Sequence, residues 1–308
     1  MQIRTDLAME SRESSGGIPG VSQRVYSHGL IEEIHVIIET DQAAKALDKA
    51  KGTYITLSHP SLYRAEAAER MTLARLLAKA LRSLLPEKGD LMIVGLGNRR
   101  MTADALGSRV LDSLLITRHM KGVSPDGLID RLRGVCAVAP GVLGVTGMET
   151  AEMVHGIAER VRPAAVIAID ALAAWECSRI CNTIQVTDTG ILPGSGVGNH
   201  RAGLTQETMG IPVIAIGVPM VVYAAVIARD ALNMLILDSG ISREKHEDAM
   251  NAMVDRAAQK GLGDLVVTPR EVDDMVGRVA RILADGLNIA LQPGLSEEEI
   301  FALSHDSL

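Results

Sequence analysis

The chain has 308 residues, 47% of them hydrophobic, and a formal net charge of −7. This length and apolar content suit one sizeable core, and an acidic balance without a long basic run argues against a nucleic-acid partner. The three cysteines are too few for a disulfide framework and favour a reducing compartment and structural roles: Cys136, Cys177 and Cys181.

Before residue 90, the pattern predicts an arm, two short strands and one long helix. Residues 11–25 are rich in Ser and Gly and are expected to form a flexible arm. Strand signals follow at residues 34–39 and 54–58. Apolar residues with helical spacing between residues 64 and 84 predict an amphipathic helix. No apolar stretch is suited to crossing a membrane and the N-terminus lacks a signal-peptide core, so we expect a cytoplasmic protein.

From residue 91 onward, short apolar runs alternate with helical patterns. The runs predict buried strands at residues 91–96, 135–139, 165–169, 183–186 and 213–217. Helices are predicted from Thr102 to about His119, from Thr146 or Gly147 to Arg160, and from about Arg270 to Ala290. This alternation predicts an α/β fold, with a mostly parallel sheet covered by helices on both faces.

Polar residues follow three of the predicted strands. Asn98 and Asp104 follow the strand at residues 91–96, Asp170 follows that at 165–169, and Asp188 follows that at 183–186. A Gly-rich loop with Gly194, Ser195 and Gly196 comes after Asp188. Because the carboxyl ends of parallel strands meet at one edge of a sheet, we expect these residues to converge there. The simpler alternatives are that each aspartate caps a helix or anchors a loop, and that the Gly-rich loop is a tight turn rather than an anion or oxyanion cradle.

A pair of aspartates brought together in this way is suited to hydrolysis. Two neighbouring carboxylates do not both ionise easily, because mutual repulsion raises the pKa of one of them. The ionised member takes a proton from water, and the protonated member polarises a carbonyl or protonates the leaving amine. The triplet Asp188-Thr189-Gly190 matches the signature of all-β aspartic proteases, but those enzymes use two triplets, and this chain has one in an α/β pattern.

Ordered motifs run along nearly all of residues 4–292. They include VGLGN at 94–98, TADALG at 102–107, APGVLG at 139–144, AIDALAA at 168–174, NTIQVTDTGILPGSGVGN at 182–199 and VTPREVD at 267–273. Together these motifs resemble those of the germination protease family of endospore-forming bacteria. The resemblance implies an endopeptidase that degrades small acid-soluble spore proteins during germination, with a fold similar to that of the hydrogenase-maturation endopeptidases. The family's two catalytic aspartates fall on Asp104 and Asp170.

The resemblance also implies a zymogen, a homotetramer and a location in the cytoplasm of the forespore or in the spore core. We expect no metal and no cofactor, and the charge and the lack of a membrane-spanning stretch predict no nucleic-acid or membrane partner. The N-terminal run Thr5-Asp6-Leu7-Ala8-Met9-Glu10 has the residue order of the family's cleavage sites. We therefore predict that residues 1–6 form a short pro-segment, removed by self-cleavage between Asp6 and Leu7, and that residues 7–308 form a single α/β peptidase domain. The alternative is that this run simply begins a strand or an arm.

Two other functions remain open at this point. One is a metal-dependent maturation-type endopeptidase of the same fold, in which Asp104 and Asp170 hold a divalent ion that prefers oxygen ligands. The other is a non-catalytic relative that binds a peptide or an anion through its Gly-rich loops.

Overall fold

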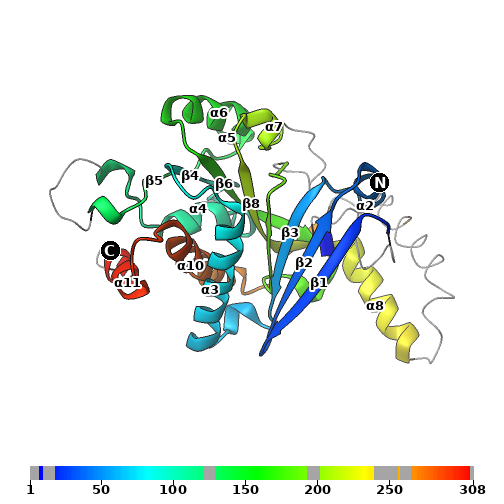
Figure 1. The fold of residues 1–308 in the computed structure, drawn as a ribbon. Helices are drawn as coiled ribbons and strands as arrows, with labels where there is room; N and C mark the ends of the chain where they lie inside the picture. Colours follow the sequence, from blue (N-terminus) through cyan, green and yellow to red (C-terminus); the bar gives the residue numbers. More distant parts are fainter. Residues whose placement is uncertain are drawn as a thin grey trace.

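The computed structural model describes residues 7–9, 18–120, 129–192, 202–238, 256 and 265–305. In this part of the chain, nine strands form one sheet in the order β1-β2-β3-β7-β8-β6-β4-β5, and β9 pairs with β8 (Figure 1). The strands are β1 (Val21–His28), β2 (Ile31–Ile38), β3 (Gly52–Ser58), β4 (Leu91–Gly95), β5 (Val135–Val138), β6 (Ala165–Ala174), β7 (Thr183–Thr187), β8 (Val213–Tyr223) and β9 (Val266–Val267).

One half of the sheet is parallel, and helices cover both of its faces. β8, β6, β4 and β5 are consecutive parallel neighbours, and every residue of β4 is buried. Two-sided burial explains why these strands have continuous apolar runs rather than alternation. Residues of α3, α4 and α10 pack on one face and residues of α6 and α7 on the other. The predicted α/β class is confirmed.

The helices are α2 (Asp41–Leu47), α3 (Ala67–Leu84), α4 (Leu106–Leu111), α5 (Leu143–Thr146), α6 (Thr150–Val161), α7 (Gln206–Met209), α8 (Ala224–Asp238), α10 (Val272–Leu291) and α11 (Glu297–His305). α3 and α10 pack closely at Gly286, where an added Cβ would lie 2.7 Å from Leu77 Cδ2 and 3.0 Å from Ala74 O. None of the described helices is long and apolar enough to cross a membrane.

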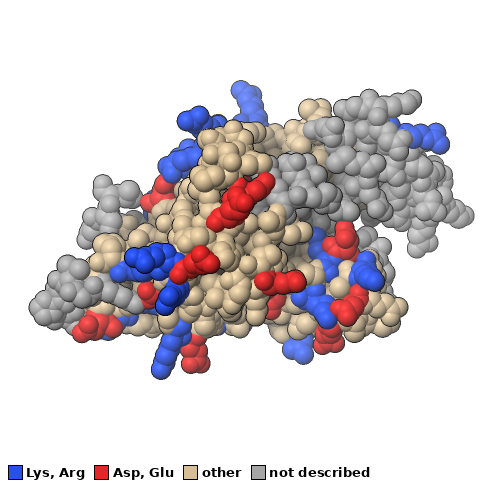
Figure 2. Space-filling view, turned by 90° about the horizontal axis from the view of Figure 1, so that it is seen from above, with Lys and Arg blue, Asp and Glu red and all other residues tan. Residues whose placement is uncertain are grey.

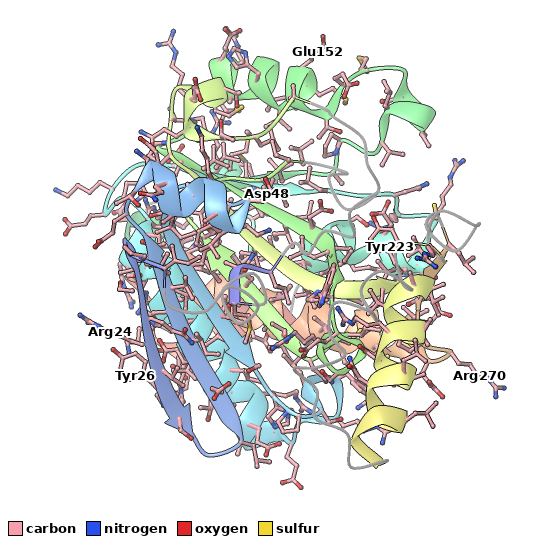
Figure 3. The ribbon with its side chains drawn as sticks, turned by 90° about the vertical axis from the view of Figure 1, so that its right-hand side faces the viewer. Arg24, Tyr26, Asp48, Glu152, Tyr223 and Arg270 are labelled. Carbon is pink, nitrogen blue, oxygen red and sulfur yellow. The ribbon has the colours of Figure 1, made fainter. Side chains whose placement is uncertain are left out.

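The other half of the sheet is antiparallel, so the whole sheet is mixed. β1, β2 and β3 form a meander, and β7 runs antiparallel to both β3 and β8. Strand β1 corrects the expectation that the flexible arm continues to residue 25, because it pairs with β2 along its whole length. Nearly all its side chains are exposed, so it lacks the apolar alternation that marks a strand in sequence. Figure 3 shows Arg24 and Tyr26 projecting from this hairpin.

The helix expected from Thr102 to His119 is much shorter. The structure has a 3-10 turn, η2 (Thr102–Asp104), followed by α4, which ends at Leu111. Beyond α4, the Asn288 side chain on α10 supplies hydrogen-bond partners to the backbone. Its Oδ1 accepts the Leu115 N–H at 2.9 Å, and its Nδ2 donates to Ser113 O at 3.0 Å. A contact between residues so far apart in the chain overrides the local helical pattern.

Candidate active site

A tight glycine turn after β4 positions Asp104. Gly97 has φ +93, and a Cβ there would lie 2.0 Å from Asp104 O and 2.8 Å from Asp104 Oδ1. The Asn98 N–H donates to Asp104 Oδ2 at 2.8 Å, and the Asn98 Oδ1 accepts the Arg100 N–H at 3.0 Å. Only glycine fits this φ and this close approach. The turn therefore fixes the half-buried Asp104 carboxylate at the end of β4.

Asp170 lies on the strand next to that turn. β4 and β6 are parallel, with Gly95 opposite Ile169, and the N–H of Leu96 donates to Ile169 O at 2.8 Å. Asp170 is 8% exposed, and its Oδ1 accepts the Ala171 N–H at 2.9 Å. The η2 turn that ends at Asp104 contacts both β6 and β8. The structure thus brings the elements that carry the two aspartates together.

A second glycine allows this close junction. A Cβ on Gly107, in α4, would lie 2.5 Å from Ile169 O and from the backbone N and O of Leu96. Helix α4 therefore rests directly on the end of β4 and on the middle of β6, as only glycine permits. Asp104 is half-buried and follows the end of β4, whereas Asp170 is nearly buried and lies inside β6, which continues to Ala174. Two carboxyl groups carried by neighbouring parallel strands can perform acid–base chemistry on a bound substrate.

Asp188 does not join the other two aspartates. β7 runs antiparallel to β8, and Gln185 and Asp170 are both in register with Gly217. Asp188 is three residues beyond Gln185, so it lies about 10 Å from the level of Asp170, toward the opposite edge of the sheet. Exposed Asp188 instead accepts the Thr53 N–H at 2.8 Å and anchors the start of β3. The expectation that all three aspartates converge is wrong for Asp188, because a buried strand has the same apolar pattern in either direction.

The Gly-rich loop residues Gly194, Ser195 and Gly196 lie outside the described residues, as does Asp6. Their proposed roles stay predictions. The chain on either side of that loop is paired: Ile191 and Leu204 exchange backbone hydrogen bonds of 2.9 and 2.8 Å.

The N-terminal residues Leu7, Ala8 and Met9 are buried, at 0, 0 and 2% exposure, on the face of the sheet that carries Asp170. They pack with Leu172, which is two residues beyond Asp170 on the same strand and so shares its face. The Ala8 N–H donates to Gln185 Oε1 at 2.7 Å. Gln185 lies in register with Gly217, and Gly217 with Asp170. Two strand spacings therefore place Gln185 about 10 Å from Asp170.

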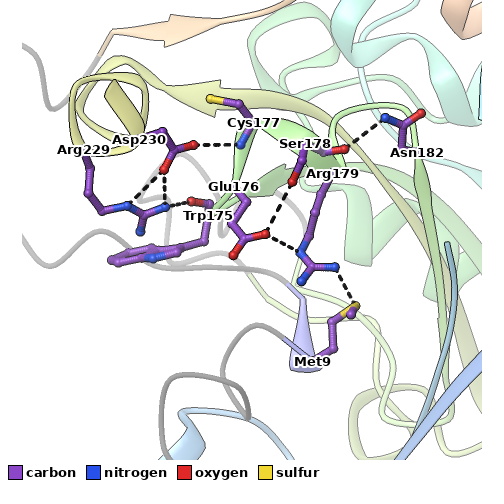
Figure 4. A network of polar contacts seen from close by, with 9 residues as sticks. All are labelled: Met9, Trp175, Glu176, Cys177, Ser178, Arg179, Asn182, Arg229 and Asp230. Atoms are coloured by element: carbon purple, nitrogen blue, oxygen red, sulfur yellow. Dashed lines mark hydrogen bonds and ion pairs between the residues drawn. The ribbon is translucent and has the colours of Figure 1, made fainter. Parts of the chain in front are cut away.

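The loop that follows β6 is tied to the same N-terminal segment. Arg179 Nη1 lies 3.3 Å from Met9 Sδ, and Arg179 Nε lies 3.3 Å from Glu176 Oε2 (Figure 4). A network of side chains thus connects the continuation of Asp170's strand to the buried N-terminal residues.

Helix α8 holds the same loop from the other side. The Arg229 guanidinium lies 4.6 Å from the ring centroid of Trp175 and donates to Asp230 Oδ1 at 2.9 Å. The N–H of Cys177 donates to Asp230 Oδ2 at 3.1 Å (Figure 4). Burial, helped by Asp230, raises the pKa of Cys177 to about 11, and burial raises the pKa of Cys181 to about 12. Thiols so hard to ionise are suited to packing rather than to nucleophilic chemistry.

Reasoning from sequence missed Gln185 as a residue near the site. A signal was available, because Gln185 is the one amide side chain inside the buried run Thr183–Thr187, and a buried amide has to find a partner. In the described part of the chain, no group of three or more His, Cys, Asp or Glu side chains is arranged to hold a metal ion. On the face in Figure 2, acidic and basic side chains are scattered among uncharged ones.

Comparisons with known proteins agree over nearly the whole chain. The family model described as "Germination protease" matches residues 2–261. The germination protease of Clostridium tetani is 40% identical, covering 97% of this chain and 98% of its own length. That of Clostridium perfringens is 42% identical with the same coverage, and that of Bacillus pumilus is 34% identical, covering 99% of this chain and 97% of its own length.

Among solved structures, the [NiFe] hydrogenase maturation protease HycI of Thermococcus kodakarensis is similar at 18% identity. The match covers 68% of this chain and 98% of that one, with a TM-score of 0.34, and a likeness so loose says nothing further about the site. The family match and the relatives suffice: the chain belongs to the germination protease family, and it is a peptidase.

Proposed function

We propose that this chain hydrolyses small acid-soluble spore proteins during germination and uses Asp104 and Asp170 to activate water. The observation that supports this proposal is the junction of β4 and β6: the glycine turn at Gly97 fixes Asp104 at the end of β4, and the η2 turn that ends at Asp104 contacts β6, the strand that carries Asp170. Family membership supports the spore protein as substrate, and the junction supports the aspartate pair as the chemical centre.

In this mechanism, the two carboxyl groups share one proton. The ionised carboxylate takes a proton from a water molecule as the water oxygen attacks the peptide carbonyl carbon, and the protonated carboxyl donates a hydrogen bond to the carbonyl oxygen. The tetrahedral intermediate then loses its C–N bond as the carboxyl group that took the proton from water passes that proton to the amine nitrogen, which restores the shared-proton state of the pair. Neither step forms a covalent bond between the protein and the substrate. The α/β fold that carries the pair makes this an atypical aspartic endopeptidase, because the pepsin-like aspartic proteases are all-β.

Incubation with a small acid-soluble spore protein, with and without a chelator, tests the function. We expect cleavage at a few discrete bonds, read by mass spectrometry, at the same rate in both samples. Cleavage that stops with the chelator and returns with Mg²⁺ or Mn²⁺ would support the metal-dependent alternative, in which the two aspartates supply oxygen ligands. No cleavage under any condition would support a non-catalytic binding protein.

We also propose that the chain is a zymogen that cuts itself between Asp6 and Leu7. The support is the position of Leu7, Ala8 and Met9, which are packed against Leu172 on the face of the sheet that carries Asp170. A tethered segment near the active site reacts as if at high local concentration. N-terminal sequencing after incubation at mildly acidic pH should show a new end at Leu7, absent from Asp104→Asn. A fully active enzyme that keeps Met1 would contradict it.

Assembly into a homotetramer in the cytoplasm of the forespore or the spore core is proposed from the same family resemblance. Exposed apolar side chains on the β1–β2 hairpin support an association surface: Val25 is 51%, Tyr26 43% and Leu30 62% exposed. Sedimentation equilibrium should give four times the mass of one chain, and a monomer at every concentration would refute the tetramer.

A further inference from the structure

One hydrogen bond between side chains ties the Asp104 turn to helix α10. Thr102, the first residue of η2, donates its Oγ1 hydroxyl to Asp273 Oδ1 at 2.7 Å. Asp273 lies in the first turn of α10. The η2 turn also contacts β6 and β8, so the turn that carries Asp104 lies between the sheet on one side and the start of α10 on the other.

The start of α10 is itself fastened to strand β8. β9 pairs antiparallel with the end of β8. One residue later, the Thr268 hydroxyl donates to Met220 O at 2.9 Å. The Val272 N–H then donates to Pro269 O at 3.2 Å as the helix begins. This short path leaves the first turn of α10 little freedom to move relative to β8.

Strand β8 in turn flanks Asp170. Asp170 pairs with Gly217, and the register shifts further along, with Leu172 opposite Pro219 and Ala173 opposite Val221. Met220 is therefore the extra residue of a bulge beside a proline, which has no N–H for the ladder. The Thr268 hydroxyl satisfies the Met220 carbonyl at this irregular point. The first turn of α10 is thus placed by the strand that also places Asp170.

We propose that Asp273 is a positioning residue for the aspartate pair. It acts through the Thr102 hydroxyl, which holds η2 at a fixed place relative to β8 and so fixes Asp104 relative to Asp170. This role rests on the proposed function of the pair. A hydrogen bond to a carboxylate is among the stronger ones in proteins, and acid–base groups lose efficiency steeply when they move by about 1 Å.

The test removes each partner in turn. Asp273→Ala deletes the acceptor and Thr102→Val deletes the donor, and both sites are accessible enough to accept the change. Asp274→Ala is the matched control, because Asp274 is the next residue of the same helical turn and accepts from Arg278 Nε at 3.0 Å rather than from η2. We expect the first two variants to lower kcat on a small acid-soluble spore protein by about tenfold to a hundredfold, with KM within about twofold. Asp274→Ala should stay near the wild-type kcat.

Conservative variants separate positioning from general destabilisation. Thr102→Ser keeps the hydroxyl and Asp273→Asn keeps an acceptor oxygen, so both should retain kcat within about threefold. The double variant Thr102→Val with Asp273→Ala should be no slower than the slower single one, because both remove the same bond. If Asp273→Ala and Asp274→Ala have equal kcat while Asp104→Asn is inactive, the positioning role is refuted and the proposed function stands. An active Asp104→Asn would overturn both.

Discussion

Replacing Gly97 with alanine should displace Asp104 and reveal how tightly its turn is built. The added Cβ would lie 2.0 Å from Asp104 O, and real Cβ contacts essentially never fall below 3.0 Å. The Asp104 backbone therefore has to move by about 1 Å, and a misplacement of that size costs about a hundredfold in rate. The alanine also inherits φ +93, which adds about 1–3 kcal/mol of backbone strain.

Gly210→Ala is a suitable control, because Gly210 has φ +68 but nothing within 4 Å of an added Cβ. Both variants should lose stability in urea unfolding, by about 1 kcal/mol for the control. Only Gly97→Ala should lose about a hundredfold in kcat on a small acid-soluble spore protein. If Gly97→Ala cleaves within about threefold of the wild-type rate, the turn does not place a catalytic group.

Two further predictions concern the surroundings of the site. Gln185→Leu leaves the buried Ala8 N–H without its acceptor and should lower the free energy of unfolding by about 1–3 kcal/mol. Gln23→Leu, on the exposed β1, is the control, and equal urea midpoints for the two variants would show that the Gln185–Ala8 hydrogen bond does not stabilise the fold. With pKa values of about 11 and about 12, Cys177 and Cys181 are ionised to only about one part in a thousand and one in ten thousand at pH 8. Thiol labelling followed by peptide mapping should therefore be slow at both until the protein is unfolded, and fast labelling of the folded protein would refute the raised pKa values.

The parallel half of the fold could be predicted from sequence because its strands carry their own signal. The run Leu91–Gly95 is apolar throughout and buried throughout. The strand expected at residues 165–169 is also present, but it continues to Ala174, so Asp170 lies inside β6 rather than after its end. The α10 helix, expected at about Arg270 to Ala290, spans Val272–Leu291. In these places local pattern and tertiary environment agree, which is the condition for a correct prediction.

The direction of β7, the end of α4 and the presence of β1 could not be predicted, because they depend on contacts between residues far apart in the sequence. The direction of β7 decides where Asp188 lies, and the apolar run of β7 has no direction. The end of α4 is set by Asn288, far along the chain. Strand β1 is held by its backbone pairing to β2 rather than by buried side chains. The site was therefore predicted in part: the elements of Asp104 and Asp170 meet, and Asp188 does not join them.

The most direct test of the aspartate pair is the cleavage rate of a small acid-soluble spore protein by the wild type, Asp104→Asn, Asp170→Asn and the double variant. Each single change removes one member of a unit that works only as a pair, so each should lower kcat by about a thousandfold or more with the fold intact by circular dichroism. The double variant should be no slower than the slower single one. A single Asn variant that cleaves at near the wild-type rate would show that its aspartate is not catalytic and would contradict the mechanism.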